Sequence, residues 1–166
     1  MLPDTSETRK EHYLYPGMLF ASPQPHTVTT VLGSCISVCL WDPVLRVGGI
    51  NHYMLALWNG EGLPSPKYGN IAIPKLIEKM LAMGSRKENL QAKVFGGAAV
   101  IQASNGLMNV GERNIILAED MLQEEQIPVV GIDVGGHLGR KLLFHTESGE
   151  VFLKKLKGAR LGPQGV

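Results

Sequence analysis

The chain has 166 residues and a formal net charge of +1 at pH 7, with 16 lysine and arginine against 15 aspartate and glutamate side chains. A chain of this length can bury the core of one domain without disulfides or metals. A charge so close to zero excludes the long-range field of a protein that binds nucleic acid or anionic membranes, so the composition favours a specific protein surface as the partner.

We expect one domain over residues 16–156, between a flexible polar N-terminus at 1–15 and a flexible glycine-rich tail at 157–166. The first residues lack the apolar segment of a signal peptide. The longest apolar-rich stretch, residues 31–41, is far shorter than the ~20 residues of a membrane span. We therefore expect no membrane insertion.

Both cysteines, Cys35 and Cys39, lie in this apolar stretch, four residues apart. A strand would hold them too far apart for a disulfide, so we expect reduced thiols in a cytoplasmic protein.

The first half of the chain predicts extended segments that are interrupted by glycine. Residues 28–32 are rich in β-branched side chains, and residues 36–41 alternate between two faces after the break at Gly33-Ser34. A third apolar stretch, residues 47–57, carries Gly48-Gly49 and leads into the glycine- and proline-rich segment 58–68. That segment is the longest irregular loop we expect inside the domain, and a loop of this kind can cover a site.

Two helices are predicted. Apolar residues three and four apart indicate a helix over 73–81, with Pro74 in its first turn and Gly84 past its end. Asn109, with Glu112 three residues later, forms a capping pattern for the second helix. The apolar residues of that helix are Ile115, Ile116, Ala118, Met121 and Leu122.

The remaining segments with strand patterns are residues 92–95, 128–134, 141–145 and 151–156. Because strands occur in runs while helices occur at only two places, the sequence predicts an α+β fold rather than a βαβ repeat. We expect mixed or antiparallel sheets packed centrally, with helices on the outer faces.

Cys35 and His52 form the strongest chemical lead. They lie 17 positions apart, each where a strand pattern meets glycine. A thiol and an imidazole suffice for covalent acyl chemistry when the fold brings them together. The flexible Gly33-Ser34 would let the N–H groups of Ser34, Cys35 and Ile36 face a developing oxyanion, with His52 as base and then acid.

Residue type and spacing alone leave a structural interpretation open, because free cysteine and strand-end histidine are often core residues. Cys39 has no glycine beside it, so we interpret it as a packing residue. Zinc ligation by Cys35, Cys39, His26 and His52 is disfavoured because no close Cys-x2-Cys or His-x3-His pair occurs. We expect neither a metal nor a cofactor.

Two glycine-rich segments invite a phosphate-binding interpretation. Residues 135–141 end in Arg140-Lys141, but their spacing fits neither a dinucleotide fingerprint nor a P-loop, and a strand pattern follows. We interpret this segment as a tight turn and Gly96-Gly97 as close backbone packing beside the site. A basic cluster near the C-terminus is either a solvated tail or a docking patch for an acidic partner. It comprises Lys154, Lys155, Lys157 and Arg160.

Taken together, these segments resemble the CheD family, the chemoreceptor glutamine deamidases of bacterial and archaeal chemotaxis. The matching pieces, in family order, are Leu32-Gly33-Ser34-Cys35, Trp41-Asp42-Pro43, Gly48-Gly49-Ile50-Asn51-His52-Tyr53-Met54-Leu55, Tyr68-Gly69, Ala92-Lys93-Val94-Phe95-Gly96-Gly97-Ala98, Gly111-Glu112-Arg113-Asn114, Asp133-Val134-Gly135-Gly136 and Gly139-Arg140.

The resemblance implies a fold like the catalytic domain of the cytotoxic necrotising factor toxins and a triad of threonine, cysteine and histidine. Family positions map onto Thr29, Cys35 and His52. Adjacent strand residues face opposite ways, so only one of Thr29 and Thr30 can meet His52, and Thr27 shares the face of Thr29.

The activity implied is hydrolysis of glutamine side chains of methyl-accepting chemotaxis receptors to glutamate, through a thioester and without a cofactor. A CheC-type phosphatase of CheY is implied as a possible regulatory partner at the same cleft. The residues that contact substrate are not identified by the sequence, and the loop 58–68 is the candidate for shaping access. The alternatives are a non-catalytic chemotaxis adaptor and a transglutaminase-like enzyme in which an amine replaces water.

Overall fold

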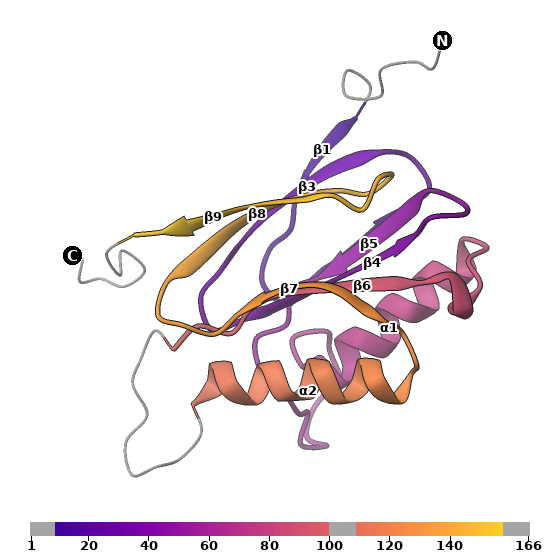
Figure 1. Ribbon diagram of the computed structural model, residues 1–166. Coiled ribbons are helices and arrows are strands. Elements are labelled where there is room, and N and C mark those ends of the chain that lie inside the picture. The colour runs from indigo at the N-terminus through magenta and orange to yellow at the C-terminus, as the bar shows by residue number, and fades with distance from the viewer. Residues whose placement is uncertain (1–8, 100–108, 158–166) are drawn as a thin grey trace.

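The computed structural model describes residues 9–99 and 109–157, and within these ranges two sheets and two α-helices form three layers (Figure 1). A four-stranded sheet and a five-stranded sheet pack face to face, and both helices cover the far side of the five-stranded sheet. The predicted α+β class is confirmed. The helices, however, lie on one outer face of the sheet pair rather than on both.

The four-stranded sheet has the order β1-β3-β8-β9. Its strands are β1 (Lys10–Tyr13), β3 (His26–Leu32), β8 (Gly139–His145) and β9 (Val151–Leu156). The five-stranded sheet has the order β2-β5-β4-β6-β7. Its strands are β2 (Leu19–Ser22), β5 (Val47–Asn51), β4 (Ile36–Asp42), β6 (Gln91–Gly96) and β7 (Val129–Val134). Both sheets are mixed, since β1 pairs parallel with β3 and β7 parallel with β6 while the other pairs are antiparallel.

Strand β4 lies between two apolar cores, which explains its continuous apolar run. Ile36, Val38 and Leu40 face the helices, while Cys39 faces the four-stranded sheet. The core between the two sheets contains Leu14, Val28, Leu32, Cys39, Ile50, Phe95, Leu142 and Phe144. Cys35 packs against the edge of this inter-sheet core, so the predicted nucleophile lies at one end of the sandwich.

Both predicted helices are present. Helix α1 (Gly69–Ala82) begins one turn earlier than its apolar spacing predicts and contains Pro74 in its N-terminal half. Helix α2 (Val110–Glu124) has the predicted cap, in which Asn109 Oδ1 accepts a hydrogen bond from the Glu112 N–H at 2.9 Å. Two apolar residues assigned to the buried faces by spacing, Leu81 and Ile116, are instead 42% exposed.

The N-terminus differs from its prediction as a flexible segment over residues 1–15. Strand β1 pairs with β3 in register from Lys10 opposite His26 to Tyr13 opposite Thr29, and Leu14 is 1% exposed in the inter-sheet core. The strand sequence Lys-Glu-His-Tyr is polar and carries no alternating apolar pattern, so it is held by its backbone pairing with β3 and by the stacking of His12 on Phe20 rather than by an apolar face. Residues 1–8 and 158–166 lie outside the described residues.

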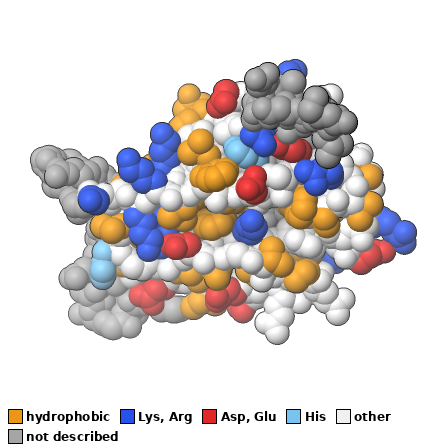
Figure 2. All heavy atoms as spheres, turned by 45° about the horizontal axis from the view of Figure 1, so that its top comes forward, with side chains coloured by type: hydrophobic (Ala, Val, Ile, Leu, Met, Phe, Trp, Pro, Cys, Tyr) orange, Lys and Arg blue, Asp and Glu red, His pale blue; other side chains and the backbone are white. Residues whose placement is uncertain are grey.

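The outer face of the four-stranded sheet carries basic, acidic and apolar side chains in a mixed arrangement (Figure 2). Lys154 and Lys155 of the basic cluster are exposed on β9, and Lys155 Nζ lies 3.7 Å from Asp133 Oδ1. Arg160 lies outside the described residues, so the docking patch stays a prediction. None of the helices in residues 9–99 and 109–157 has the length and hydropathy of a bilayer-spanning segment.

Candidate active site

His52 lies just after β5 and is 1% exposed. Its backbone is fixed from both sides by the segment that follows β1. The His52 N–H donates to the Met18 carbonyl at 3.1 Å, and the His52 carbonyl accepts from the Gly17 N–H at 2.8 Å. Two backbone hydrogen bonds therefore set the position from which the imidazole projects.

The imidazole is oriented by Thr30 of β3, in the opposite sheet. Thr30 Oγ1 lies 2.7 Å from His52 Nδ1 and donates to the Leu14 carbonyl at 2.8 Å. A carbonyl can only accept, so the single hydroxyl proton points at Leu14 and the Thr30 oxygen accepts from Nδ1–H. This network assigns the neutral tautomer in which Nε2 is unprotonated and available to accept a proton.

Thr29, the threonine predicted from the family pattern, does not meet the histidine. Thr30 shares the inward face of β3 with Val28 and Leu32 and is fully buried, whereas Thr29 lies on the opposite face and is partly exposed. The rule that adjacent strand residues face opposite ways is confirmed, but the choice between them is corrected to Thr30.

Cys35 and His52 are brought to one face by the register of two antiparallel segments. Cys39 pairs with Ile50, and Ile36 pairs with Tyr53 through two backbone hydrogen bonds of 3.0 and 2.9 Å. Continued by one position beyond Ile36 and Tyr53, this register sets Cys35 opposite Met54, two positions from His52 on the same face. Such diagonal neighbours are ~7–8 Å apart, within reach of a long side chain.

The turn that carries Cys35 is held by the backbone after β6. The Gly97 N–H donates to the Cys35 carbonyl at 2.9 Å, and the Ala98 N–H donates to the Gly33 carbonyl at 3.0 Å. Gly96 has φ +112°, and a Cβ there would lie 2.1 Å from the Cys35 carbonyl oxygen. Only glycine permits this approach, so the interpretation of Gly96-Gly97 as close packing beside the site is confirmed.

The predicted oxyanion donors divide into two groups. The Ile36 N–H is already bonded to the Tyr53 carbonyl at 3.0 Å, so it is removed from the predicted set. The N–H groups of Ser34 and Cys35 have no acceptor in the described part of the chain and are free to bind an oxyanion.

Burial shifts the pKa values of both reacting groups toward their neutral forms. It raises the pKa of the Cys35 thiol above its usual value and lowers the pKa of His52 to about 4. At neutral pH the resting pair is therefore a thiol beside a neutral imidazole, and His52 must remove the thiol proton during attack rather than hold a preformed ion pair.

Asn114 of α2 joins the two segments of the site, and the sequence interpretation assigned it no role beyond a family motif. Its Nδ2 donates to the carbonyls of Ser34 and Met54, each at 3.0 Å, and its own backbone carbonyl accepts from the Tyr53 hydroxyl at 2.5 Å. The residue is fully buried. Its two acceptors lie 80 and 60 positions away in the sequence, so no local pattern indicates this structural role.

Comparison with known proteins identifies the family. A family model described as CheD chemotactic sensory transduction matches residues 56–155. A protein of Trichlorobacter lovleyi named "Probable chemoreceptor glutamine deamidase CheD" is 51% identical over 154 residues, which cover 93% of this chain and 95% of that protein. A protein of the same name from Sulfurimonas denitrificans is 48% identical over 147 residues, which cover 87% of this chain and 94% of that protein. The chain belongs to the CheD family.

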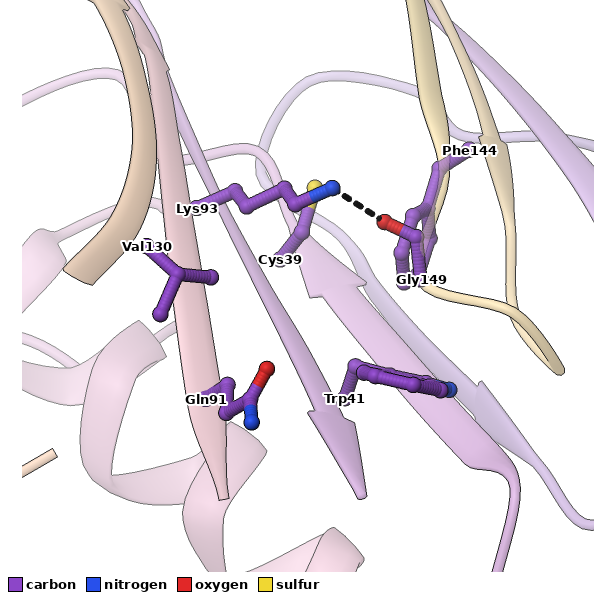
Figure 3. A pocket seen from close by; sticks show the side chains of 7 residues that line it. All are labelled: Cys39, Trp41, Gln91, Lys93, Val130, Phe144 and Gly149. Atoms are coloured by element: carbon purple, nitrogen blue, oxygen red, sulfur yellow. Dashed lines mark hydrogen bonds between the residues drawn. The ribbon is translucent and has the colours of Figure 1, made fainter. Parts of the chain in front are cut away.

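The second cysteine of this CheD chain is sealed in the inter-sheet core. Cys39 is 2% exposed, and burial raises its thiol pKa far above the usual value. Figure 3 shows Lys93 extending across it, with Nζ donating to the Gly149 carbonyl at 2.8 Å. The adjoining cavity is only about 10 Å³, which is room for one water. The interpretation of Cys39 as a packing residue is confirmed.

Within the segment 135–141, residues 135–138 form the predicted turn, and strand β8 begins at Gly139, two residues earlier than predicted. Gly135 and Gly136 have φ of +83° and +72°, and β8 follows directly. Arg140 is 2% exposed and its guanidinium is bound within the turn, since Nε donates to Asp133 at 2.8 Å and Nη2 to the Gly135 carbonyl at 2.9 Å. Nη1 also donates to the Gly96 carbonyl at 3.3 Å, so each guanidinium nitrogen already holds an acceptor within or beside the turn.

His26, one of the two histidines considered as zinc ligands, has other neighbours. His26 Nδ1 lies 2.9 Å from the Gln24 carbonyl and its ring packs edge-on to Phe20. Among the described residues, no three His, Cys, Asp or Glu side chains are grouped to hold a metal ion.

The two thiols are expected to differ sharply toward iodoacetamide. In the native protein Cys35 should be alkylated while Cys39 reacts only after unfolding, because the reagent attacks accessible thiolate. Since the pKa of Cys35 is raised, the rate should climb with pH and reach its midpoint above that of a free thiol. Peptide mapping by mass spectrometry at several pH values measures both rates, and a Cys35 midpoint below pH 7 would contradict the neutral resting pair.

Proposed function

We propose that this CheD chain hydrolyses glutamine side chains of methyl-accepting chemotaxis receptors to glutamate, with Cys35 as nucleophile, and that it does so in the cytoplasm. The names of its relatives, the Thr30–His52 hydrogen bond and the pairing of Ile36 with Tyr53, next to Cys35 and His52, support this function. The observation that carries the proposal is the Thr30–His52 hydrogen bond, because it leaves Nε2 free as the base on the face that carries the thiol.

In the proposed first half-reaction, Cys35 Sγ attacks the carbonyl carbon of the glutamine side chain while His52 Nε2 takes the thiol proton. The N–H groups of Ser34 and Cys35 bind the oxyanion. His52 then gives the proton to the amide nitrogen, the C–N bond breaks, and ammonia leaves a thioester on Cys35. Thr30 accepts from Nδ1–H throughout and keeps the ring in place.

In the second half-reaction, His52 Nε2 takes a proton from water, whose oxygen attacks the thioester carbon. The C–S bond breaks, the proton returns to sulfur, and glutamate is released. Because the pKa of His52 is about 4, the imidazole remains neutral across the physiological range and is ready for both steps.

Purified protein with a chemoreceptor fragment separates this function from the two alternatives. A deamidase releases one ammonia for each glutamate formed and does so unchanged when a primary amine is added. A transglutaminase-like enzyme would incorporate the amine instead, and a non-catalytic adaptor would bind the fragment without releasing ammonia. Mass spectrometry of the fragment together with an ammonia assay measures these outcomes, and either alternative result would overturn the proposal.

Two further expectations from the resemblance belong with this proposal. We infer that the two-sheet core is related to the catalytic domain of the cytotoxic necrotising factor toxins, which also combines central mixed sheets with outer helices. We also infer that a CheC-type phosphatase of CheY can occupy the cleft beside Cys35 as a regulator, with the loop 58–68 shaping access. A regulator bound there should slow alkylation of Cys35 as well as deamidation.

A further inference from the structure

A groove of about 250 Å³ lies beside the nucleophile turn, between helix α2 and the chain segment that follows His52. Its lining residues are Leu55, Ala56, Leu57, Val110, Arg113 and Asn114. The volume is below the ~300–1,000 Å³ of typical small-molecule sites. It therefore suits the side chains of a docked polypeptide better than a complete small ligand.

The groove is connected to the active site through Asn114. Asn114 is one of the lining residues, and its buried side chain donates to the carbonyls of Ser34, which precedes Cys35, and Met54, which follows Tyr53. A polypeptide seated in the groove would therefore lie against the segments that hold the nucleophile.

The side chains that line the groove indicate which kind of polypeptide segment it binds. Leu55 and Leu57 are 38% and 65% exposed and give the groove an apolar side. Arg113 is exposed, and its guanidinium has no ion-pair partner in the described residues. An unpaired guanidinium beside apolar side chains suits a segment that presents a carboxylate next to apolar residues.

We propose that this groove docks the chemoreceptor segment next to the target glutamine and that Arg113 binds a carboxylate of that segment. The inference rests on the proposed deamidase function and adds to it a preference among substrate glutamines. Each turnover converts a glutamine to a glutamate, so the substrate gains carboxylates as the reaction proceeds. Glutamines with a glutamate nearby are the preferred substrates, and one deamidation favours the next.

Charge reversal in the groove provides the test. Arg113→Glu is expected to raise KM for a chemoreceptor fragment about tenfold, because an attractive charge contact becomes repulsive. Alkylation of Cys35 by iodoacetamide should keep its rate, since this small reagent does not use the groove. Arg86→Glu is the matched control, because within the described part of the chain Arg86 pairs only with Glu88, in an exposed ion pair whose residues do not line the groove.

Two receptor fragments sharpen the result. In one, the glutamates near the target glutamine are replaced by glutamine, and in the other by lysine. The native protein should have a higher KM for both altered fragments than for the unaltered fragment. The Arg113→Glu variant should be more active than the native protein on the lysine fragment. An Arg113→Glu variant with the native KM for every fragment would overturn the groove proposal. Absence of deamidation by the native protein would instead overturn the proposed function.

Discussion

His52→Asn is expected to lower kcat for receptor deamidation by ~10²–10⁴-fold, the range that general acid–base catalysis contributes. Asparagine can place an N–H near the position of Nδ1 and so keep a donor for Thr30, but it has no group at the position of Nε2. The substitution therefore removes the proton acceptor while retaining the hydrogen bond that links the two sheets. Steady-state ammonia release measures kcat.

The control for this variant is His26→Asn, which changes another histidine of the sheet region whose ring contacts Phe20 and not the site. Its kcat should match the native value. Circular dichroism and thermal unfolding verify that both variants are folded. A folded His52→Asn protein whose kcat stays within threefold of the native value would show that another group moves the proton.

Thr30→Val is expected to lower kcat ~10–100-fold, less than the ~10⁴-fold that follows loss of a charged orienting carboxylate in a serine-protease triad. Valine has the shape of threonine without the hydroxyl, so the Nδ1–H loses its acceptor and the ring is free to adopt other orientations and the other tautomer. The substitution also leaves the Leu14 carbonyl and Nδ1–H buried without partners, which costs about 1–3 kcal/mol of folding free energy for each.

Thr29→Val and Thr30→Ser distinguish positioning of the His52 ring by the hydroxyl of residue 30 from packing of the threonine methyl group. Thr29 lies on the outer face of β3, so its replacement should leave kcat unchanged. Serine restores the hydroxyl at position 30 and should recover most of the lost kcat although it lacks the methyl group. Equal losses for Thr29→Val and Thr30→Val, or no recovery with serine, would contradict the assignment of Thr30.

The elements that the sequence predicts well are those with a strong apolar period or a capping pattern. Helix α1, the Asn109 cap of α2 and strand β4, whose side chains point alternately to its two faces, all follow from local residue spacing. The segments that carry Cys35 and His52 are predictable for the same reason. Their meeting on one face depends on the pairing of Ile36 with Tyr53, which no local pattern specifies.

Three features of the site lack a local signal. The choice of Thr30 over Thr29 depends on which face of β3 turns toward the other sheet, and alternation alone leaves both options open. Strand β1 has no apolar pattern, although the chain just after it supplies the Leu14 carbonyl that fixes the Thr30 proton. Asn114 acts on Ser34 across 80 positions of sequence, a contact that only the tertiary fold creates.

The most direct test of the account is the glutamine-to-glutamate conversion of a chemoreceptor fragment by the native protein, Cys35→Ala and Cys39→Ala, quantified by mass spectrometry. We predict conversion by the native protein and by Cys39→Ala, and none by a folded Cys35→Ala. Conversion by Cys35→Ala at the native rate would contradict the central claim that this thiol is the nucleophile.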